Sequence, residues 1–220
     1  MIKRAIANIL TTIPATVKLV AVSKTKPNNL LQEAYDAGQR VFGENKAQEM
    51  AGKAIALPND IQWHFIGHLQ SNKVKYIASS VSVIHSVDSF KILKKIDKEA
   101  KKNERVIQVL LQFHIAKEVS KFGFNLETAK EMLELDEFQL LENIEIIGVM
   151  GMATFTDDHA IVRNEFKKLK SIFTQLKQTH FSDKNHFSEV SMGMSGDYQI
   201  AIEEGSTMIR VGSSIFGSRG

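Results

Sequence analysis

The sequence predicts a single (β/α)8 barrel, the α/β fold also called a TIM barrel, with one leading N-terminal helix. Eight apolar, strand-like runs alternate with amphipathic helical stretches along the 220 residues. The order strand, helix, strand implies parallel pairing through right-handed crossovers, and eight strands are the number that closes such a barrel. A doubly wound open sheet is the competing architecture. No Gly-x-Gly-x-x-Gly follows the first strand, which argues against a dinucleotide fold.

The first expected strand, Val17–Ser23, carries the clearest signal of burial. Its apolar residues run on without polar alternation, which is typical of a strand buried on both faces of a parallel sheet. Pro27 ends this segment and suits the start of the helix that follows. Lys24 is therefore expected at the carboxyl end of a buried strand, on the face of a barrel where chemistry takes place.

The other elements follow in alternation, with turn and cap signals at their boundaries. Gly38 and Gly205 each separate a helical pattern from the next strand, as glycines that end helices do. The expected N-caps are Asn28, Ser89 and Asp157 or Asp158. The remaining expected strands are Arg40–Gly43, Gln62–Ile66, Val81–Val87, Val106–His114, Ile144–Met152, Phe187–Met192 and Met208–Val211. The expected helices are Lys3–Leu10, Asn28–Ala37, Glu44–Ala56, Ser71–Ala78, Ser89–Lys102, Leu126–Leu135, Asp158–Lys177 and Gly196–Glu204. The chain shows no linker composition, so we expect one domain over residues 1–220.

Composition excludes several classes of protein and of site. The net charge is +3, from 28 basic and 25 acidic residues, which is too balanced to indicate a nucleic-acid or anionic membrane partner. The chain has no cysteine, which excludes disulfides, thiolate metal sites and cysteine nucleophiles. No apolar run approaches the ~20 residues of a membrane span, and no secretory leader is evident, so we expect a cytoplasmic protein.

Lys24 has two interpretations. As a solvated residue in a strand-to-helix loop it would have no chemical role. With a lowered pKa at a barrel mouth it would form an imine with an aldehyde. Polar and glycine-rich residues follow most of the other strands, and the carboxyl ends of all eight strands meet at one face. This gathering of polar residues favours the second interpretation.

Two segments near the end of the chain suit a phosphate group. Ser191–Asp197 leads from the seventh strand into a helix, and Arg210–Gly217 follows the eighth. Their glycines let backbone N–H groups approach a ligand, and Ser195 is an expected helix cap that can also donate its hydroxyl. Loops after strands seven and eight commonly bind phosphate in such barrels. Two ordinary glycine turns are the competing interpretation.

Arg210 shares the strand parity of Gly212, so both are expected to face the same ligand. An arginine stays charged, and would therefore keep a ring nitrogen beside it unprotonated. The alternative is a rim arginine in a salt bridge of little energetic value.

The histidines do not predict a metal site. His64 and His68 are four residues apart, but the residues between them resemble strand and turn, so the helical two-histidine geometry is lost and no carboxylate is expected nearby. We expect both to make hydrogen bonds at the barrel mouth. The sequence also lacks a Ser-His-Asp order and a Gly-x-Ser-x-Gly elbow.

Six motifs, spread over nearly the whole chain and in the right order, closely resemble those of the YggS/PROSC-type pyridoxal phosphate homeostasis proteins. They are Ala21–Pro27 (AVSKTKP), Phe42–Asn45 (FGEN), Trp63–Lys73 (WHFIGHLQSNK), Ser120–Gly123 (SKFG), Ser191–Asp197 (SMGMSGD) and Arg210–Gly217 (RVGSSIFG).

The resemblance implies a fold-type III barrel similar to the N-terminal domain of alanine racemase. It also implies that Lys24 forms an internal aldimine, a Schiff base, with pyridoxal 5′-phosphate (PLP), that Arg210 faces the pyridine nitrogen and that Asn45 supports the ring edge. The implied cofactor-binding set is completed by Met194, Ser195, Gly212 and Ser213, of which the last three hold the phosphate. Lys26 and Lys121 match family lysines and are implied as secondary or transfer sites for the aldehyde.

The implied function is PLP homeostasis, the reversible storage and delivery of PLP with little or no turnover. An arginine at the ring nitrogen weakens the electron sink that PLP catalysis requires. The chain also ends at Gly220, directly after the barrel, so we expect the opposite face of the cofactor to lack a positioned acid. We expect a monomer that contacts PLP-dependent apoenzymes transiently. Two alternatives stay open: a small type III PLP enzyme such as an amino-acid racemase, and a barrel enzyme acting on a phosphorylated metabolite without PLP.

Overall fold

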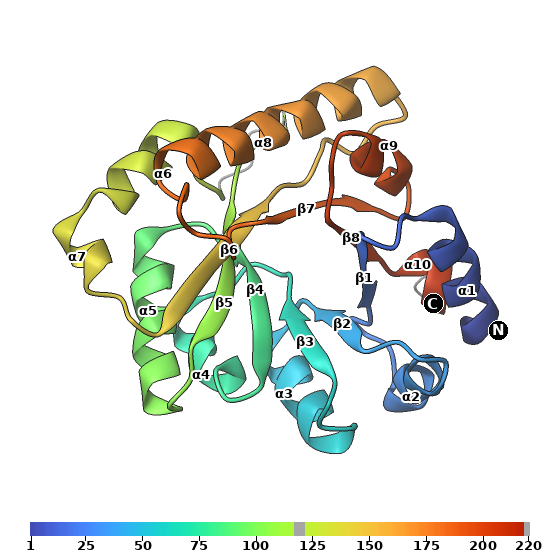
Figure 1. The fold of residues 1–220 in the computed structure, drawn as a ribbon. Coiled ribbons are helices and arrows are strands. Elements are labelled where there is room, and N and C mark those ends of the chain that lie inside the picture. Colours follow the sequence, from blue (N-terminus) through green and yellow to red (C-terminus); the bar gives the residue numbers. More distant parts are fainter. Residues whose placement is uncertain (117–121, 218–220) are drawn as a thin grey trace.

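A computed structural model describes residues 1–116 and 122–217, and Figure 1 shows their fold. Eight parallel strands form a closed barrel in chain order, with the last strand paired to the first. This arrangement confirms the predicted (β/α)8 barrel. The strands are β1 (Lys18–Val22), β2 (Val41–Glu44), β3 (Gln62–Phe65), β4 (Val81–Val87), β5 (Ile107–Gln112), β6 (Ile144–Met150), β7 (Glu189–Met194) and β8 (Met208–Val211).

Helices connect the strands and surround the barrel, and the long helix α8 crosses its outside (Figure 1). The leading helix α1 was predicted and is confirmed; it contacts α2 and α10, so that the two ends of the described chain lie close together. The helices are α1 (Ile2–Thr12), α2 (Asn28–Asp36), α3 (Ala47–Ala56), the 3-10 turn η1 (Ser71–Lys73) with α4 (Val74–Ile77), α5 (Phe90–Lys102), α6 (Leu126–Leu133), α7 (Asp136–Gln139), α8 (His159–Thr179), α9 (Tyr198–Glu203) and α10 (Ser213–Phe216).

Strand β1 has the double-sided burial that its composition predicts. The consecutive residues Leu19, Val20 and Ala21 are all buried. In β1, Ala21 pairs with Phe42 of β2 on one side, and Val20 pairs with Arg210 of β8 on the other. The strand is therefore paired along both edges and buried on both faces, as expected of an apolar run without alternation.

The apolar core has two parts. The larger part lies between the strands and the surrounding helices. A smaller, separate cluster comes from β4, β5, β6 and β8 and fills part of the barrel interior, as side chains do in barrels of eight strands. Its members are Val83, Leu110, Ile147, Met150 and Met208.

Some boundaries differ from the expectation. The helix expected from Glu44 begins at Ala47, because Glu44 completes β2 and its carboxylate is buried against Ser23 and Lys53. Helices α7 and α10 were not expected from the sequence. Each has only four residues, which is too short for a helical period to appear in the pattern.

The turn and cap predictions have mixed outcomes. Gly38 and Gly205 have φ angles of +98° and +89°, the left-handed conformation expected after a helix. Asp158 caps α8 by accepting two backbone N–H groups of the first turn. Asn28 is not an N-cap, because it is already the first residue of α2 and the preceding proline occupies the cap position. Ser89 does occupy the N-cap of α5, but its hydroxyl donates to the neighbouring aspartate instead of accepting from the helix.

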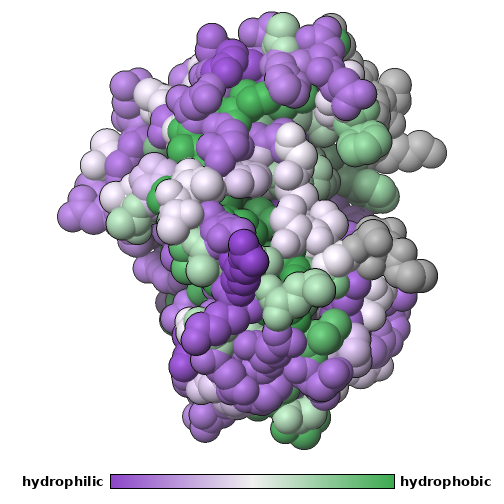
Figure 2. Space-filling view, turned by 90° about the vertical axis from the view of Figure 1, so that its right-hand side faces the viewer, coloured by the Kyte–Doolittle hydropathy of each residue, from purple (hydrophilic) through white to green (hydrophobic). Residues whose placement is uncertain are grey.

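The face of the molecule in Figure 2 is mostly hydrophilic, and hydrophobic residues are visible in its centre and in smaller areas near its upper and lower ends. Within the described parts of the chain, no helix combines the length and the apolar character needed to cross a bilayer.

Candidate cofactor-binding site

A cavity of about 560 Å³ opens at the carboxyl ends of the strands. Its walls come mainly from the segments that follow β1, β2, β3, β6, β7 and β8. All seven residues that were expected to bind a cofactor line it: Lys24, Asn45, Met194, Ser195, Arg210, Gly212 and Ser213. Lys26 lines it as well, whereas Lys121 lies outside the described residues. Closure of the barrel thus brings together residues that are up to 189 positions apart.

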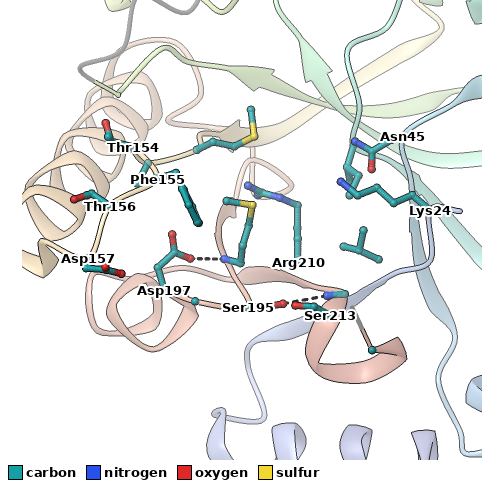
Figure 3. A pocket seen from close by; sticks show the side chains of 18 of the residues that line it. Lys24, Asn45, Thr154, Phe155, Thr156, Asp157, Ser195, Asp197, Arg210 and Ser213 are labelled. Carbon is teal, nitrogen blue, oxygen red and sulfur yellow. Dashed lines mark hydrogen bonds between the residues drawn. The ribbon is translucent and has the colours of Figure 1, made fainter. Parts of the chain in front are cut away.

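Lys24 and Asn45 lie beside one another on one wall of the cavity (Figure 3). Asn45 directly follows β2, and its backbone is packed so tightly against Gly67 that a Cβ at position 67 would lie 2.3 Å from the Asn45 carbonyl oxygen. The side-chain oxygen Oδ1 of Asn45 is buried without a hydrogen-bond partner. A buried acceptor of this kind is costly unless something donates to it, so the site holds one acceptor ready for a ligand donor.

The segment after β7 forms a tight loop whose residues line the cavity. Gly193 has a φ of +96°, and a Cβ there would lie 2.6 Å from the Cβ of Ala201 in α9. The carboxylate of Asp197 accepts the Met194 N–H at 2.5 Å and so closes the loop (Figure 3). Burial raises the pKa of this carboxyl group. Ser195 was expected to cap the helix, but the N-cap of α9 is Asp197, and Ser195 precedes it by two residues.

The loops after β7 and β8 are joined by a hydrogen bond. The backbone N–H of Gly212 donates to Ser195 Oγ at 3.3 Å (Figure 3). Gly212 also lies close to β1, because a Cβ at this position would be 3.0 Å from the Val22 carbonyl oxygen. Helix α10 starts immediately afterwards at Ser213, and the first N–H groups of a helix have no partner within it. Two residues with hydroxyl groups, Ser195 and Ser213, therefore line the side of the cavity expected to hold a phosphate.

Arg210 lies on β8 at the back of the cavity and is 4% exposed. Its Nη1 donates to Ser191 Oγ at 2.6 Å, and its Nη2 donates to the Gly151 carbonyl at 3.1 Å. Burial lowers the pKa of the guanidinium to about 10, while the nearby Asp197 carboxylate acts in the opposite direction. The group is still cationic at neutral pH. The alternative of a rim salt bridge is therefore wrong: Arg210 is buried and held by neutral acceptors.

A chain of buried hydrogen bonds continues from Arg210 into the barrel. Ser191 Oγ accepts from Arg210 and also makes a hydrogen bond with His85 Nδ1 at 2.9 Å. His85 Nε2 makes a hydrogen bond with His64 Nδ1 at 2.8 Å, and the tautomers of the two rings set which nitrogen donates. Burial is the main cause that lowers the pKa of His64 to about 3 and that of His85 well below its ordinary value. Both rings are neutral, and Ser191 links them to the Arg210 guanidinium.

The histidines also correct two expectations. His64 is 1% exposed inside the barrel, not at its mouth. His68 is exposed, but its Nδ1 is 3.2 Å from the carboxylate of Asp88, so the expectation that no carboxylate lies nearby is wrong for this residue. Residues 1–116 and 122–217 contain no cluster of three or more histidine or acidic side chains that could hold a metal ion.

The sequence analysis missed one wall of the cavity. The segment after β6 contributes Phe155 and Thr156, which lie across the cavity from Lys24 and Asn45 (Figure 3). His159, the first residue of α8, also lines the cavity. Glu165 of α8 anchors this segment by accepting both the N–H and the hydroxyl of Thr154, at 2.7 and 2.8 Å. The sequence contains no motif in this segment. Its only signal is its place directly after a barrel strand, which puts it at the face where the cavity opens.

Chemically, the site combines a lysine amine, an unused amide oxygen, a buried guanidinium and serine hydroxyls. Donors of this kind suit an anion, and the amine suits an electrophilic carbon. The arrangement therefore fits a small anionic ligand with a carbonyl group.

Comparison with known proteins agrees with this geometry. The family model described as "Alanine racemase, N-terminal domain" matches residues 1–220. Proteins named pyridoxal phosphate homeostasis protein are similar over nearly the full length: that of Synechocystis sp. is 40% identical over 97% of this chain and 96% of its own, and that of Aquifex aeolicus is 39% identical over 92% and 87%.

Solved structures give the same result. PipY of Synechococcus elongatus has 34% sequence identity and covers 99% of this chain and 100% of its own, with a TM-score of 0.91 without PLP and 0.88 with PLP bound. An alanine racemase from Bartonella henselae matches with a TM-score of 0.73 but only 15% identity, over 99% of this chain and 58% of its own, so that likeness concerns the fold alone. By its matched family model, its relatives and its barrel, this chain belongs to the pyridoxal phosphate homeostasis protein family.

Proposed function

We propose that this protein binds PLP reversibly and serves in PLP homeostasis, as a carrier that stores and delivers the cofactor without significant turnover. One observation carries the proposal: Lys24, Asn45, Arg210 and the two donor-rich loops after β7 and β8 all open onto one cavity. The names of the relatives describe the same role, and one related structure is described with PLP bound. Residues 1–220 would form one PLP-binding domain.

The residues present fit this cofactor. The buried, unpartnered Oδ1 of Asn45 leaves a hydrogen-bonding capacity that the protein itself does not use. Gly212 has no side chain and therefore packs directly against Val22 of β1, which brings its backbone to the wall of the cavity. The donors of Ser195, Gly212 and Ser213, with Met194 beside them, would hold the phosphate.

When bound, PLP would supply an aldehyde carbon that is reactive toward a primary amine. Lys24 is the amine proposed here. Arg210 would face the ring nitrogen, with Asn45 at the ring edge. Because the guanidinium is positive, a proton on a neighbouring ring nitrogen is disfavoured, and the cofactor is a weaker electron sink. This electrostatic setting supports holding PLP over catalysing reactions with it.

The proposed role also includes an oligomeric state, a location and a route of delivery. The protein acts as a monomer in the cytoplasm. It passes PLP to apoenzymes through transient contacts. Lys26, which lines the same cavity as Lys24, offers a second amine for the aldehyde during transfer.

The test is an absorbance titration with PLP, followed by borohydride reduction and peptide mass analysis. Wild-type protein is expected to develop the visible band of an imine and to carry a PLP-sized mass on Lys24. Lys24→Ala should lose both, whereas Lys26→Ala, the matched control from the same cavity, should keep both. A label on another residue of wild-type protein, or no band at all, contradicts the assignment.

A second measurement separates the carrier from an enzyme. Incubation of the PLP-loaded protein with L- or D-alanine should give no racemisation beyond that of free PLP. A substantial turnover number would overturn the carrier role in favour of a small PLP-dependent racemase. A protein whose spectrum does not respond to PLP would instead support an enzyme for a phosphorylated metabolite.

A further inference from the structure

The residue after Lys24 has a conformation that needs an external cause. Thr25 has a φ of +63°, and among the described residues the only other non-glycine residue with a positive φ is Glu104. Glu104 follows the end of α5, whereas Thr25 follows a barrel strand at the cavity. A β-branched residue is strained in the left-handed region, and such strain persists only where surrounding groups impose it.

Glu49 of α3 is hydrogen-bonded to this strained residue. Its Oε1 accepts the backbone N–H of Thr25 at 2.6 Å, a short bond to an ionised acceptor. The same oxygen accepts from Lys53 Nζ at 2.7 Å, one helical turn further along α3. The carboxylate is thereby fixed on a rigid helix and holds the strained peptide in place.

Lys53 also binds the backbone of Ser23, the residue before Lys24. Its ammonium is buried and donates to the Ser23 carbonyl at 2.8 Å and to Glu44 at 2.7 Å, in addition to Glu49. All three ammonium hydrogens thus have acceptors. The Ser23 hydroxyl donates to the same Glu44 oxygen at 2.6 Å. The backbone is therefore fixed on both sides of Lys24, at Ser23 and at Thr25.

We propose that Glu49 is a positioning residue, which holds Thr25 in its strained conformation so that the side chain of Lys24 projects into the cavity for capture of the PLP aldehyde. The inference rests on the proposed function of Lys24. In the capture step, the neutral amine adds to the aldehyde carbon, a C=N bond replaces the C=O bond and one water leaves, with no change in oxidation state. A lysine has a long, flexible side chain, so directing its Cα–Cβ bond from the backbone restricts where the amine can reach.

The test compares two ligands that share a ring and a phosphate but differ in the aldehyde. Pyridoxine 5′-phosphate has an alcohol in place of the aldehyde, so it reports binding without capture. Glu49→Ala is expected to weaken apparent PLP affinity and to slow growth of the imine band by about tenfold, the size typical of losing a charged hydrogen bond. Its affinity for pyridoxine 5′-phosphate should stay within about twofold of wild type.

Glu33→Ala is the matched control, because Glu33 also accepts a backbone N–H from a distant segment, that of Ile2 at 3.1 Å, away from the cavity. It should leave both ligands unaffected. Thr25→Gly supplies the second arm, since glycine adopts a positive φ without strain. In the Thr25→Gly background the effect of Glu49→Ala should fall to about threefold or less, which is a coupling of at least about 0.7 kcal/mol between the two positions.

Equal weakening of both ligands by Glu49→Ala would show a general structural role and overturn the inference. So would an unchanged rate of imine formation, or an undiminished effect in the glycine background. If Glu49→Ala does not fold, Glu49→Met, which keeps a similar length and removes the carboxylate acceptor of the Thr25 N–H, is held to the same pair of ligands. Failure of the proposed function has a different signature: wild-type protein itself would give no imine band.

Discussion

The buried His64–His85 pair predicts a specific sensitivity of the fold to acid. Both rings are neutral in the folded protein, where burial lowers the pKa of His64 from 6.5 to about 3 and that of His85 well below 6.5. The unfolded chain therefore binds protons that the folded chain does not. Their contribution to stability is intact above pH 6.5, falls as the pH decreases below 6.5, and for His64 reaches its full loss near pH 3.

The size of the effect follows from the pKa of His64. At pH 5, which is 1.5 units below the unfolded pKa, the free energy of unfolding should be lower by about 2 kcal/mol for His64 alone. His85 adds a loss of the same sign. Burial raises the pKa of Glu44 and Asp197, which acts in the opposite direction because the folded state retains those protons.

The assay is urea unfolding at several pH values between 4 and 8, for wild type and for His64→Asn, whose amide oxygen can still accept from His85. The wild-type free energy of unfolding should fall more steeply with acid than that of the variant, with the difference growing by about 1.4 kcal/mol per pH unit below 6.5. The contributions of the two carboxyl groups cancel in this comparison. The exposed His159, changed to Asn, is the control and should follow wild type. Parallel curves for His64→Asn and wild type would refute the reasoning.

Two substitutions test the packing around the cavity, both by urea unfolding at pH 8. Gly193→Ala should lower the free energy of unfolding by about 2–4 kcal/mol, because its φ is +96° and the new Cβ would overlap Ala201; Gly196→Ala, with nothing within 4 Å of the added Cβ, should change it by less than about 0.5 kcal/mol. Equal effects of the two would contradict this account. Ser191→Ala removes the acceptor of Arg210 Nη1 and should lower the free energy of unfolding by about 1–3 kcal/mol. It should also weaken PLP binding. An unchanged PLP affinity would show that the position of Arg210 does not depend on Ser191.

Much of the fold was predictable because parallel barrels leave a strong local pattern. The expected bounds of β4 and β8 agree with the structure residue for residue, and the other six strands are displaced by no more than two residues at either end. A strand buried on both faces has to be apolar throughout, so its composition reports its environment. The one-turn helices α7 and α10 were not predicted, because four residues do not show a period.

The candidate site was predictable in part for a related reason. The carboxyl ends of all strands in a closed parallel barrel share one face, so residues that follow strands are expected together. Lys24, Arg210 and Gly212 all line the cavity as this rule predicts. The wall formed by Phe155 and Thr156 was missed, because its residues have no distinctive type and only their place in space gives them a role.

The sequence by itself therefore determined the barrel, the order of its strands and the face on which the cavity opens. These features depend on composition and on the order of residues, both of which can be read directly from the sequence. Only the tertiary structure decided which polar groups meet inside. His85 reaches Ser191 across 106 residues, and Glu49 reaches Thr25 from a neighbouring helix. Such contacts depend on strand register and on the rotation of each helix about its axis, and a change of one residue in either would send the same side chains elsewhere.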